Sequence, residues 1–273
     1  MSATNASKLL ETLREMYGLE ISCDSRCPFC SKEKAEEFEN IYDDTKLNII
    51  VIHNCVLCLL ELLSPRLEES KKAYYDSMKF LVYNRVHLNA LHLGVKYGSF
   101  NSLEILLLPY FRNITRIGPG DLIQKDCYES PIYMAIRRDR DEILKLFLDY
   151  LMEREPAILD EKMLGWGGSD VWLRRAASFG SNGCLKMLLD YKFQFGFNYE
   201  IDSSNLGGNT PLHCAARMGH PECVKILIDY GAKYDIKNNE GLTAIDIIKT
   251  KDNNDGLLGY IFPVKTKRAI KKD

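Results

Sequence analysis

The chain has 273 residues, and its 36 Lys and Arg nearly balance its 38 Asp and Glu, for a formal net charge of -2 at pH 7. Hydrophobic residues make up 46% and charged residues 27%, which excludes collagen-like, disordered and coiled-coil classes for the bulk of the chain. The balanced charge also argues against strong non-specific nucleic-acid binding, which needs a basic field.

The first predicted element is an amphipathic helix over residues 7–17, with Gly18 as its stop. Its apolar face carries Leu9, Leu10, Leu13 and Met16. The segment lacks the apolar core of a secretory signal. The best apolar run, 47–60, is shorter than the roughly 20 residues that cross a bilayer. We therefore expect an intracellular protein, in the cytoplasm with the nucleus as an alternative, that makes no membrane contact.

Two Cys-x-x-Cys pairs follow, Cys27/Cys30 and Cys55/Cys58, with Cys23 and His53 as spare candidates. Nine cysteines cannot all pair with one another, and intracellular thiols stay reduced. A structural zinc ion takes four tetrahedral sulfur or nitrogen ligands. The spacing therefore predicts zinc as a structural cofactor bound by the two pairs.

The chain around the second pair fits that prediction in one way and opposes it in another. A β-branched run, 49–54, is predicted as a strand, and residues 59–63 as a helix, so the segment is similar to a treble-clef zinc module. Free cysteine also behaves as a small buried hydrophobe, so Cys55 and Cys58 can instead be core residues. A redox role for Cys27 and Cys30 is the third alternative.

Self-similar segments fill the chain after residue 85. The clearest opens with Thr210-Pro211-Leu212-His213, and a shortened copy opens at Thr243, 33 residues later (243 − 210). Weaker copies open at residues 89, 130 and 171, and a further degenerate copy can start near Asn48. Spacings above 33 residues predict insertions after the second helix of each copy. These insertions fall at 110–125, 151–169 and 192–207.

The residue types of the clearest copy suit a pair of short helices. Thr210 can cap a helix by accepting a backbone N–H, and Pro211 suits the first helical position. The small Ala215 and Ala216 allow a close approach between helices. Gly219 can adopt the left-handed conformation that ends the first helix.

This pattern resembles the ankyrin repeat over residues 85–250. The resemblance implies a mostly α fold, an ankyrin-repeat solenoid of about five helix-pair units, several of them degenerate, with a small N-terminal Cys-rich α/β segment. The expected domains are 1–65 (helix and Cys-rich module), 66–250 (repeats) and 251–273 (basic tail). The lysines and arginines of the tail fit either a nuclear-localisation patch or a solvated terminus.

The resemblance implies a non-enzymatic adaptor or scaffold, monomeric on its own, that binds a partner protein through the concave face and loops of the repeats. No catalytic constellation is visible in the sequence. The alternative is a zinc-stabilised recognition module for nucleic acid or a ubiquitin-pathway partner, with the repeats as a targeting arm. The acidic run 31–44 argues against nucleic acid. Alignment with the family nominates these partner-binding residues: Arg137, Trp166, Trp172, Arg174, Asn205, Leu206, Asn209, Arg217, Met218, Asn238, Asn239 and Glu240.

Overall fold

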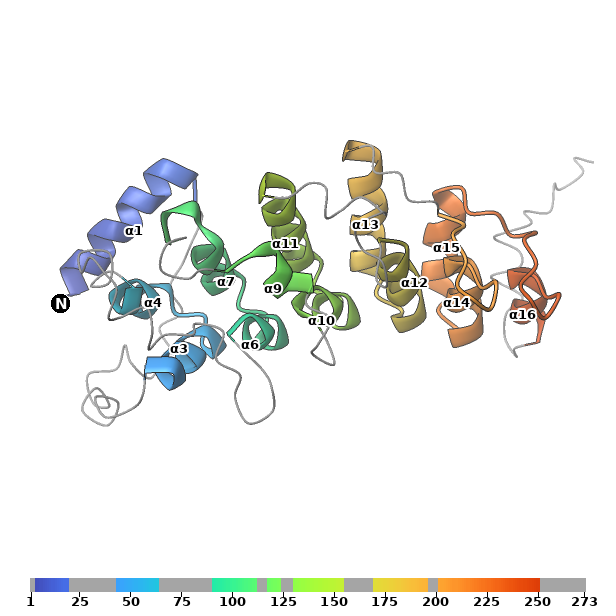
Figure 1. The fold of residues 1–273 in the computed structure, drawn as a ribbon, viewed down its shortest axis with the longest axis horizontal. Coiled ribbons are helices and arrows are strands. Elements are labelled where there is room, and N and C mark those ends of the chain that lie inside the picture. Colours follow the sequence, from blue (N-terminus) through green and yellow to red (C-terminus); the bar gives the residue numbers. More distant parts are fainter. Residues whose placement is uncertain are drawn as a thin grey trace, which may run out of the picture. The chain divides into compact units, whose positions relative to one another are not determined.

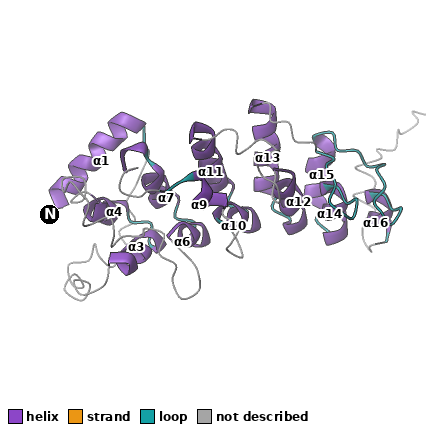
Figure 2. Ribbon diagram, viewed as in Figure 1, coloured by secondary structure: helices purple, strands orange, loops and turns teal. Residues whose placement is uncertain are grey.

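The structure is a computed structural model, and every regular element in the residues that it describes is a helix (Figure 2). Those residues are 3–19, 43–63, 90–111, 117–123, 130–154, 169–195 and 201–250. Among them the only β pairing is an isolated antiparallel bridge between Lys237 and Thr243. The mostly α fold class is confirmed. The chain divides into two compact units, 1–154 and 155–273, and each is described by itself.

Unit 1 begins with α1 (Ala3–Tyr17), which ends at Gly18 in the left-handed conformation, as predicted. Three helix pairs follow: α3 (Asp43–Ile52) with α4 (Val56–Leu63), α6 (Ala90–Tyr97) with α7 (Phe100–Leu107), and α10 (Pro131–Arg137) with α11 (Asp141–Arg154). The first helices pack as one row and the second helices as another (Figure 1). Helix α1 packs on α4. The short η1 (Pro109–Phe111) and α9 (Pro119–Ile123) lie between the last two pairs, in an interval where the sequence predicted an insertion.

Unit 2 continues the same arrangement with α12 (Ser169–Phe179) and α13 (Asn182–Phe195), then α14 (Pro211–Met218) and α15 (Pro221–Asp229). A single helix, α16 (Ala244–Lys249), ends its described part. Helices α12, α14 and α16 pack side by side as the first row, and α13 packs on α15 in the second. No helix in the described parts of either unit is both long enough and apolar enough to cross a membrane.

One turn geometry joins the two helices of each described pair. A left-handed residue, called here the turn residue, ends the first helix; it is Asn54, Gly98, Asp139, Gly180 or Gly219. The residue after it donates its N–H to the carbonyl five residues back, at 2.8–3.1 Å. The turn residues from 98 to 219 are spaced by the 41, 41 and 39 residues that the sequence predicted (98 to 139, 139 to 180, 180 to 219). Because Asn54 makes the same turn, α3 and α4 form a further repeat at residues 43–63.

Equivalent positions around this turn form the core. Five residues after the turn residue, the second helix buries an aliphatic side chain in every described pair: Leu59, Leu103, Leu144, Leu185 and Val224. Seven residues before it, the first helix does the same with Leu47, Leu91, Ile132, Leu173 and Leu212. Each such burial contributes about 1.5–3 kcal/mol. Small residues precede most turns because the helices are close: a Cβ on Gly94 would lie 2.5 Å from Leu103 Cδ2.

The predicted strand over residues 49–54 was wrong, since residues 49–52 belong to α3 and residues 53 and 54 to the turn. Leu47, Ile50 and Val51 have helical spacing, and all three are buried. Packing of this face therefore overrides the strand preference of the β-branched run. The described part of the Cys-rich segment is accordingly helical. It packs on α6 and α7 as part of the repeat array.

Candidate functional site

Two hydrogen-bonded loops of unit 2 hold most of the predicted partner-binding residues. In the first tip, residues 205–209, the Asn205 side-chain oxygen accepts hydrogen bonds from Gly207 N (2.9 Å) and Asn209 N (3.0 Å). In the second tip, residues 238–242, the Asn238 oxygen accepts from Glu240 N (3.0 Å) and Leu242 N (3.0 Å). The two asparagines do the same work one 33-residue repeat apart (238 − 205).

The two tips are also joined to each other. Asn239 Nδ2 donates to the Leu206 carbonyl at 2.9 Å, and Asn239 N donates to the Gly207 carbonyl at 3.1 Å. Gly208 is left-handed, and a Cβ there would lie 2.6 Å from Asn239 Oδ1. The loop backbones are therefore held in place before any partner binds, which reduces the entropy lost on binding.

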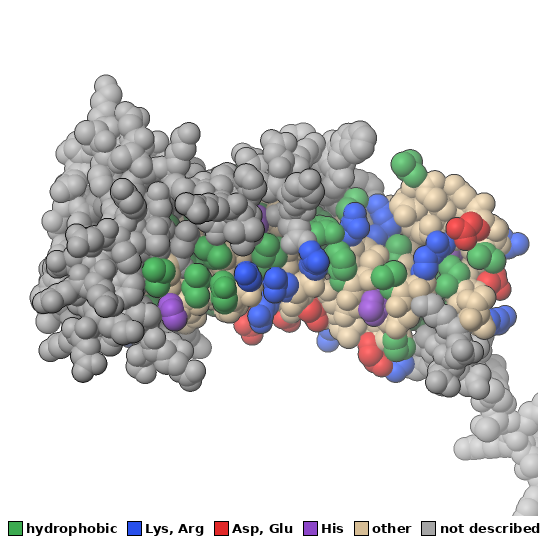
Figure 3. All heavy atoms as spheres, turned by 90° about the horizontal axis from the view of Figure 1, so that it is seen from below, with side chains coloured by type: hydrophobic (Ala, Val, Ile, Leu, Met, Phe, Trp, Pro, Cys, Tyr) green, Lys and Arg blue, Asp and Glu red, His purple; other side chains and the backbone are tan. Residues whose placement is uncertain are grey.

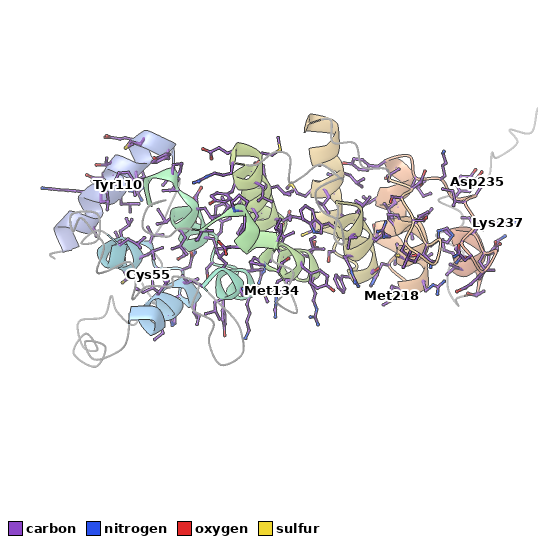
Figure 4. All side chains as sticks on the ribbon, viewed as in Figure 1. Cys55, Tyr110, Met134, Met218, Asp235 and Lys237 are labelled. Carbon is purple, nitrogen blue, oxygen red and sulfur yellow. The ribbon has the colours of Figure 1, made fainter. Side chains whose placement is uncertain are left out.

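The joined tips display side chains of mixed chemistry. Leu206 is fully exposed at the end of the first tip, with a relative accessibility of 102%. Met218, at the C-terminal end of α14, is 57% exposed (Figure 4). Arg217 Nη2 donates to Asn209 Oδ1 at 3.2 Å and forms an exposed ion pair with Glu240 at 3.4 Å. We call the exposed set the tip surface; it consists of Asn205, Leu206, Arg217, Met218, Asn239 and Glu240.

Other predicted partner-binding residues have packing roles or lie elsewhere. Trp172 and Asn238 are only 6% and 5% exposed, so they support the fold rather than the surface. Arg174 is partly buried and donates from Nη1 to the Ser203 carbonyl at 3.1 Å. Arg137 is exposed, but it belongs to unit 1. Trp166 lies outside the described residues.

Arg175 is a surface residue that the sequence analysis did not name. It is exposed on α12, one position after Arg174. A helical plot of α12 could have found it, because Trp172, Leu173, Ala176 and Ala177 are all buried and leave residue 175 on the outer side of the helix.

His213 joins α14 to the second tip. Its Nδ1 accepts a hydrogen bond from Thr210 N, and its Nε2 lies 3.1 Å from the Leu242 carbonyl. The side chain of Thr210 caps α14 by accepting from His213 N, as predicted for the motif. Burial lowers the pKa of His213, and the bond to the Leu242 carbonyl opposes that effect. The imidazole thus has a structural role between repeats.

The structure describes only the second of the two cysteine pairs. Cys55 is fully buried at the turn between α3 and α4, and Cys58 is buried on α4 (Figure 4). Cys58 is four residues after its turn residue, the position that Cys184 and Cys223 fill in unit 2, and all three are buried. A small core side chain is therefore sufficient to explain Cys58.

The remaining candidate zinc ligands leave the metal prediction open. Cys23, Cys27 and Cys30 lie outside the described residues, and His53 is half-buried in the turn. Among the described residues, no three His, Cys, Asp or Glu side chains converge as a metal site would require. The zinc site stays a prediction, because it needs residues from both pairs.

Comparison with known proteins agrees with the repeat geometry. The family described as ankyrin repeats (three copies) matches residues 173–249. No curated relative matches the chain. A crystal structure of the ankyrin repeat protein EF0377 superposes with a TM-score of 0.54 at 21% sequence identity, over 81% of this chain and 96% of that chain. At that identity the similarity concerns the fold. The chain is an ankyrin-repeat protein whose family motif lies in residues 173–249 and whose repeat turn extends back to Asn54.

Proposed function

We propose that the chain is a non-enzymatic adaptor that binds a partner protein through the tip surface and the adjoining first-row helices of unit 2. Ankyrin repeats in general bind other proteins and carry out no chemistry themselves. The proposal extends that general role to a particular surface of this chain. It also places the encounter in the cytoplasm or nucleus, where the described thiols would stay reduced.

The observation that carries the proposal is the fully exposed Leu206 on a loop with a fixed backbone. A side chain at the end of a rigid loop can insert into a partner at a small entropic cost. Met218 adds a flexible apolar side chain, and Arg217 and Glu240 add charges beside it. Apolar anchors with a polar rim are typical of protein interfaces.

The experiment compares two exposed methionines and the leucine. Met218→Asp and Leu206→Asp change the tip surface, whereas Met16→Asp changes an equally exposed methionine (58%) on α1. Each full-length variant is immobilised, and the proteins that it retains from a cell extract are quantified by mass spectrometry. Partners that bind the tip surface should be retained by the wild type and by Met16→Asp, and lost from the other two variants.

Two results would overturn this assignment. One is equal retention of every partner by all four proteins. The other is loss of the partners from Met16→Asp as well, which would show that the substitutions act without regard to position. Thermal unfolding of each variant shows whether a loss of binding comes from a loss of fold.

A further inference from the structure

We propose that the face formed by α12 and α14 binds an acidic peptide segment, in which an aliphatic or aromatic side chain is flanked by Asp or Glu. This inference rests on the proposed function and names the chemistry of the partner. It is carried by the charges on the two helices, by the positions of three arginines, and by the apolar side chains beside them.

The two helices carry positive charge and no described acidic side chain. Residues 171–179 and 211–218 contain Arg174, Arg175 and Arg217 and no Asp or Glu. Arg175 and Arg217 are exposed. Figure 3 shows the face that the first-row helices present, where Lys and Arg side chains lie among hydrophobic ones. The whole chain is slightly acidic, so this positive charge is local to the face.

The three arginines surround one point on α14, the half-buried Cys214. Burial raises the pKa of its thiol, and a hydrogen bond with Ser178 opposes that rise. The positive charges of Arg174, Arg217 and Arg175 oppose it as well, so each of them lies close enough to act on an anion there. The packing of α12 against α14 brings them together.

The arginines are held in ways that suit carboxylates. Arg174 is oriented by hydrogen bonds to the carbonyl and hydroxyl of Ser203 at 3.1 and 3.3 Å. Arg217 pairs with Glu240 at 3.4 Å, with both side chains about half exposed, and such pairs are weak. A carboxylate from a partner can therefore replace Glu240. Guanidinium groups bind carboxylates through two parallel hydrogen bonds, which favours Asp and Glu as partners.

The apolar part of the surface distinguishes a peptide from a nucleic acid. Met218 follows Arg217 in the chain and is largely exposed, and its unbranched side chain adapts to different partner side chains. Leu206 offers a second apolar contact. Glu240 stands beside Arg217 and repels the closely spaced phosphates of a nucleic acid. An acidic peptide with one apolar anchor satisfies both the charges and the apolar contacts.

The test uses random peptides displayed on phage and selected on the full-length chain. A parallel selection uses Arg175→Glu/Arg217→Glu, and a third uses Lys186→Glu/Lys233→Glu, which changes the net charge equally at exposed lysines outside this face. The wild type and the lysine variant should enrich acidic peptides with an apolar residue. The arginine variant should enrich basic ones. The best acidic peptide should bind the arginine variant about tenfold more weakly in fluorescence anisotropy, and the wild type more weakly in high salt.

Several results would overturn the inference. These are no enrichment, enrichment without acidic bias, equal binding of the best peptide to the arginine variant, an equal loss in the lysine variant, and equally tight binding of a duplex DNA. If Arg217→Glu lowers the unfolding temperature, Arg175→Glu/Arg217→Gln removes both positive charges, while the amide of the new side chain can still donate to Asn209. If selected peptides lose binding with Leu206→Asp but not with the arginine variants, the proposed function stands and this inference fails.

Discussion

Units 1 and 2 use the same turn and the same core positions, but only unit 2 contains the region that matches the family. In unit 2 the described turn residues are Gly180 and Gly219, and in unit 1 Asn54 and Asp139 take the same left-handed conformation. The motif can therefore disappear while the backbone geometry persists. Buried aliphatic residues at fixed distances from the turn are sufficient to preserve a repeat.

The units also differ in how their helices are capped. In unit 2, Thr210 and Thr243 each form a capping box with their own helix. In unit 1, Ser99 makes no side-chain cap for α7. Instead, Asn54 from the preceding repeat accepts a hydrogen bond from Ser102 N at 2.8 Å. A neighbouring repeat thus supplies the cap that the local sequence lacks.

The largest expected effect tests whether Cys58 differs from its counterpart Cys184. The zinc hypothesis predicts about one zinc ion per purified chain by elemental mass spectrometry, lost in Cys58→Ser and retained in Cys184→Ser. Loss of structural zinc costs on the order of 10 kcal/mol in small zinc modules, so a chelator should then unfold the N-terminal region. Equal metal content in both variants would show that Cys58, like Cys184, is a packing residue.

The next effect concerns one core position in the two units. Phe147 is eight residues after its turn residue, where Leu106, Leu188 and Leu227 lie in other repeats, and all four are buried. Phe147→Ala should lower the free energy of unfolding by about 3–5 kcal/mol, and Phe147→Leu by much less, because leucine fills most of the volume. Urea unfolding followed by circular dichroism measures both. Equal losses would show that the ring itself is required.

Acid should destabilise unit 1 through its buried histidine. Burial lowers the pKa of His92 from 6.5 to about 4. Between these pH values the unfolded chain binds a proton that the folded chain does not, so stability falls as the pH drops through this window and changes little above it. The loss is on the order of 2 kcal/mol. His92→Gln should reduce the decrease in urea midpoint between pH 7 and pH 4.5; an unchanged decrease would exclude His92 as its cause.

A cap present in both units gives the fourth comparison. Ser130 accepts from Tyr133 N, and Thr210 accepts from His213 N and also contacts the His213 ring. Ser130→Ala should cost about 1 kcal/mol, and Thr210→Ala up to about 2 kcal/mol because the buried imidazole loses a partner. Thermal unfolding of the two variants measures the difference. A smaller loss for Thr210→Ala would contradict the structural role of His213.

The smallest effect separates the two non-glycine turn residues. Asp139→Gly should change the stability by a few tenths of a kcal/mol, since glycine adopts its conformation freely but makes the unfolded chain more flexible. Asn54→Gly should cost about 1 kcal/mol more, because Ser102 N loses the Asn54 oxygen. Hydrogen exchange at the start of α7 should increase in Asn54→Gly alone. Identical behaviour of the two variants would rule out capping by Asn54.

The predicted surface residues show what residue types can indicate. Leu206 and Met218 were placed correctly at the surface, because the family pattern assigns them to a loop and to the end of a helix. Trp172 and Asn238 were expected beside them and are buried. A large aromatic ring and a loop asparagine suit a binding surface as well as they suit a core. Only the neighbours that surround them decide which role they take.

Local sequence patterns were enough to place the helix pairs in residues 90–250, because turn glycines, cap residues and alternating apolar positions act over short distances along the chain. Tertiary packing decided that residues 49–52 are helical, that Asn54 caps α7, and that three arginines surround Cys214. Each of these depends on packing between helices that belong to different repeats. Such contacts change the balance of local preferences, and no local pattern records them.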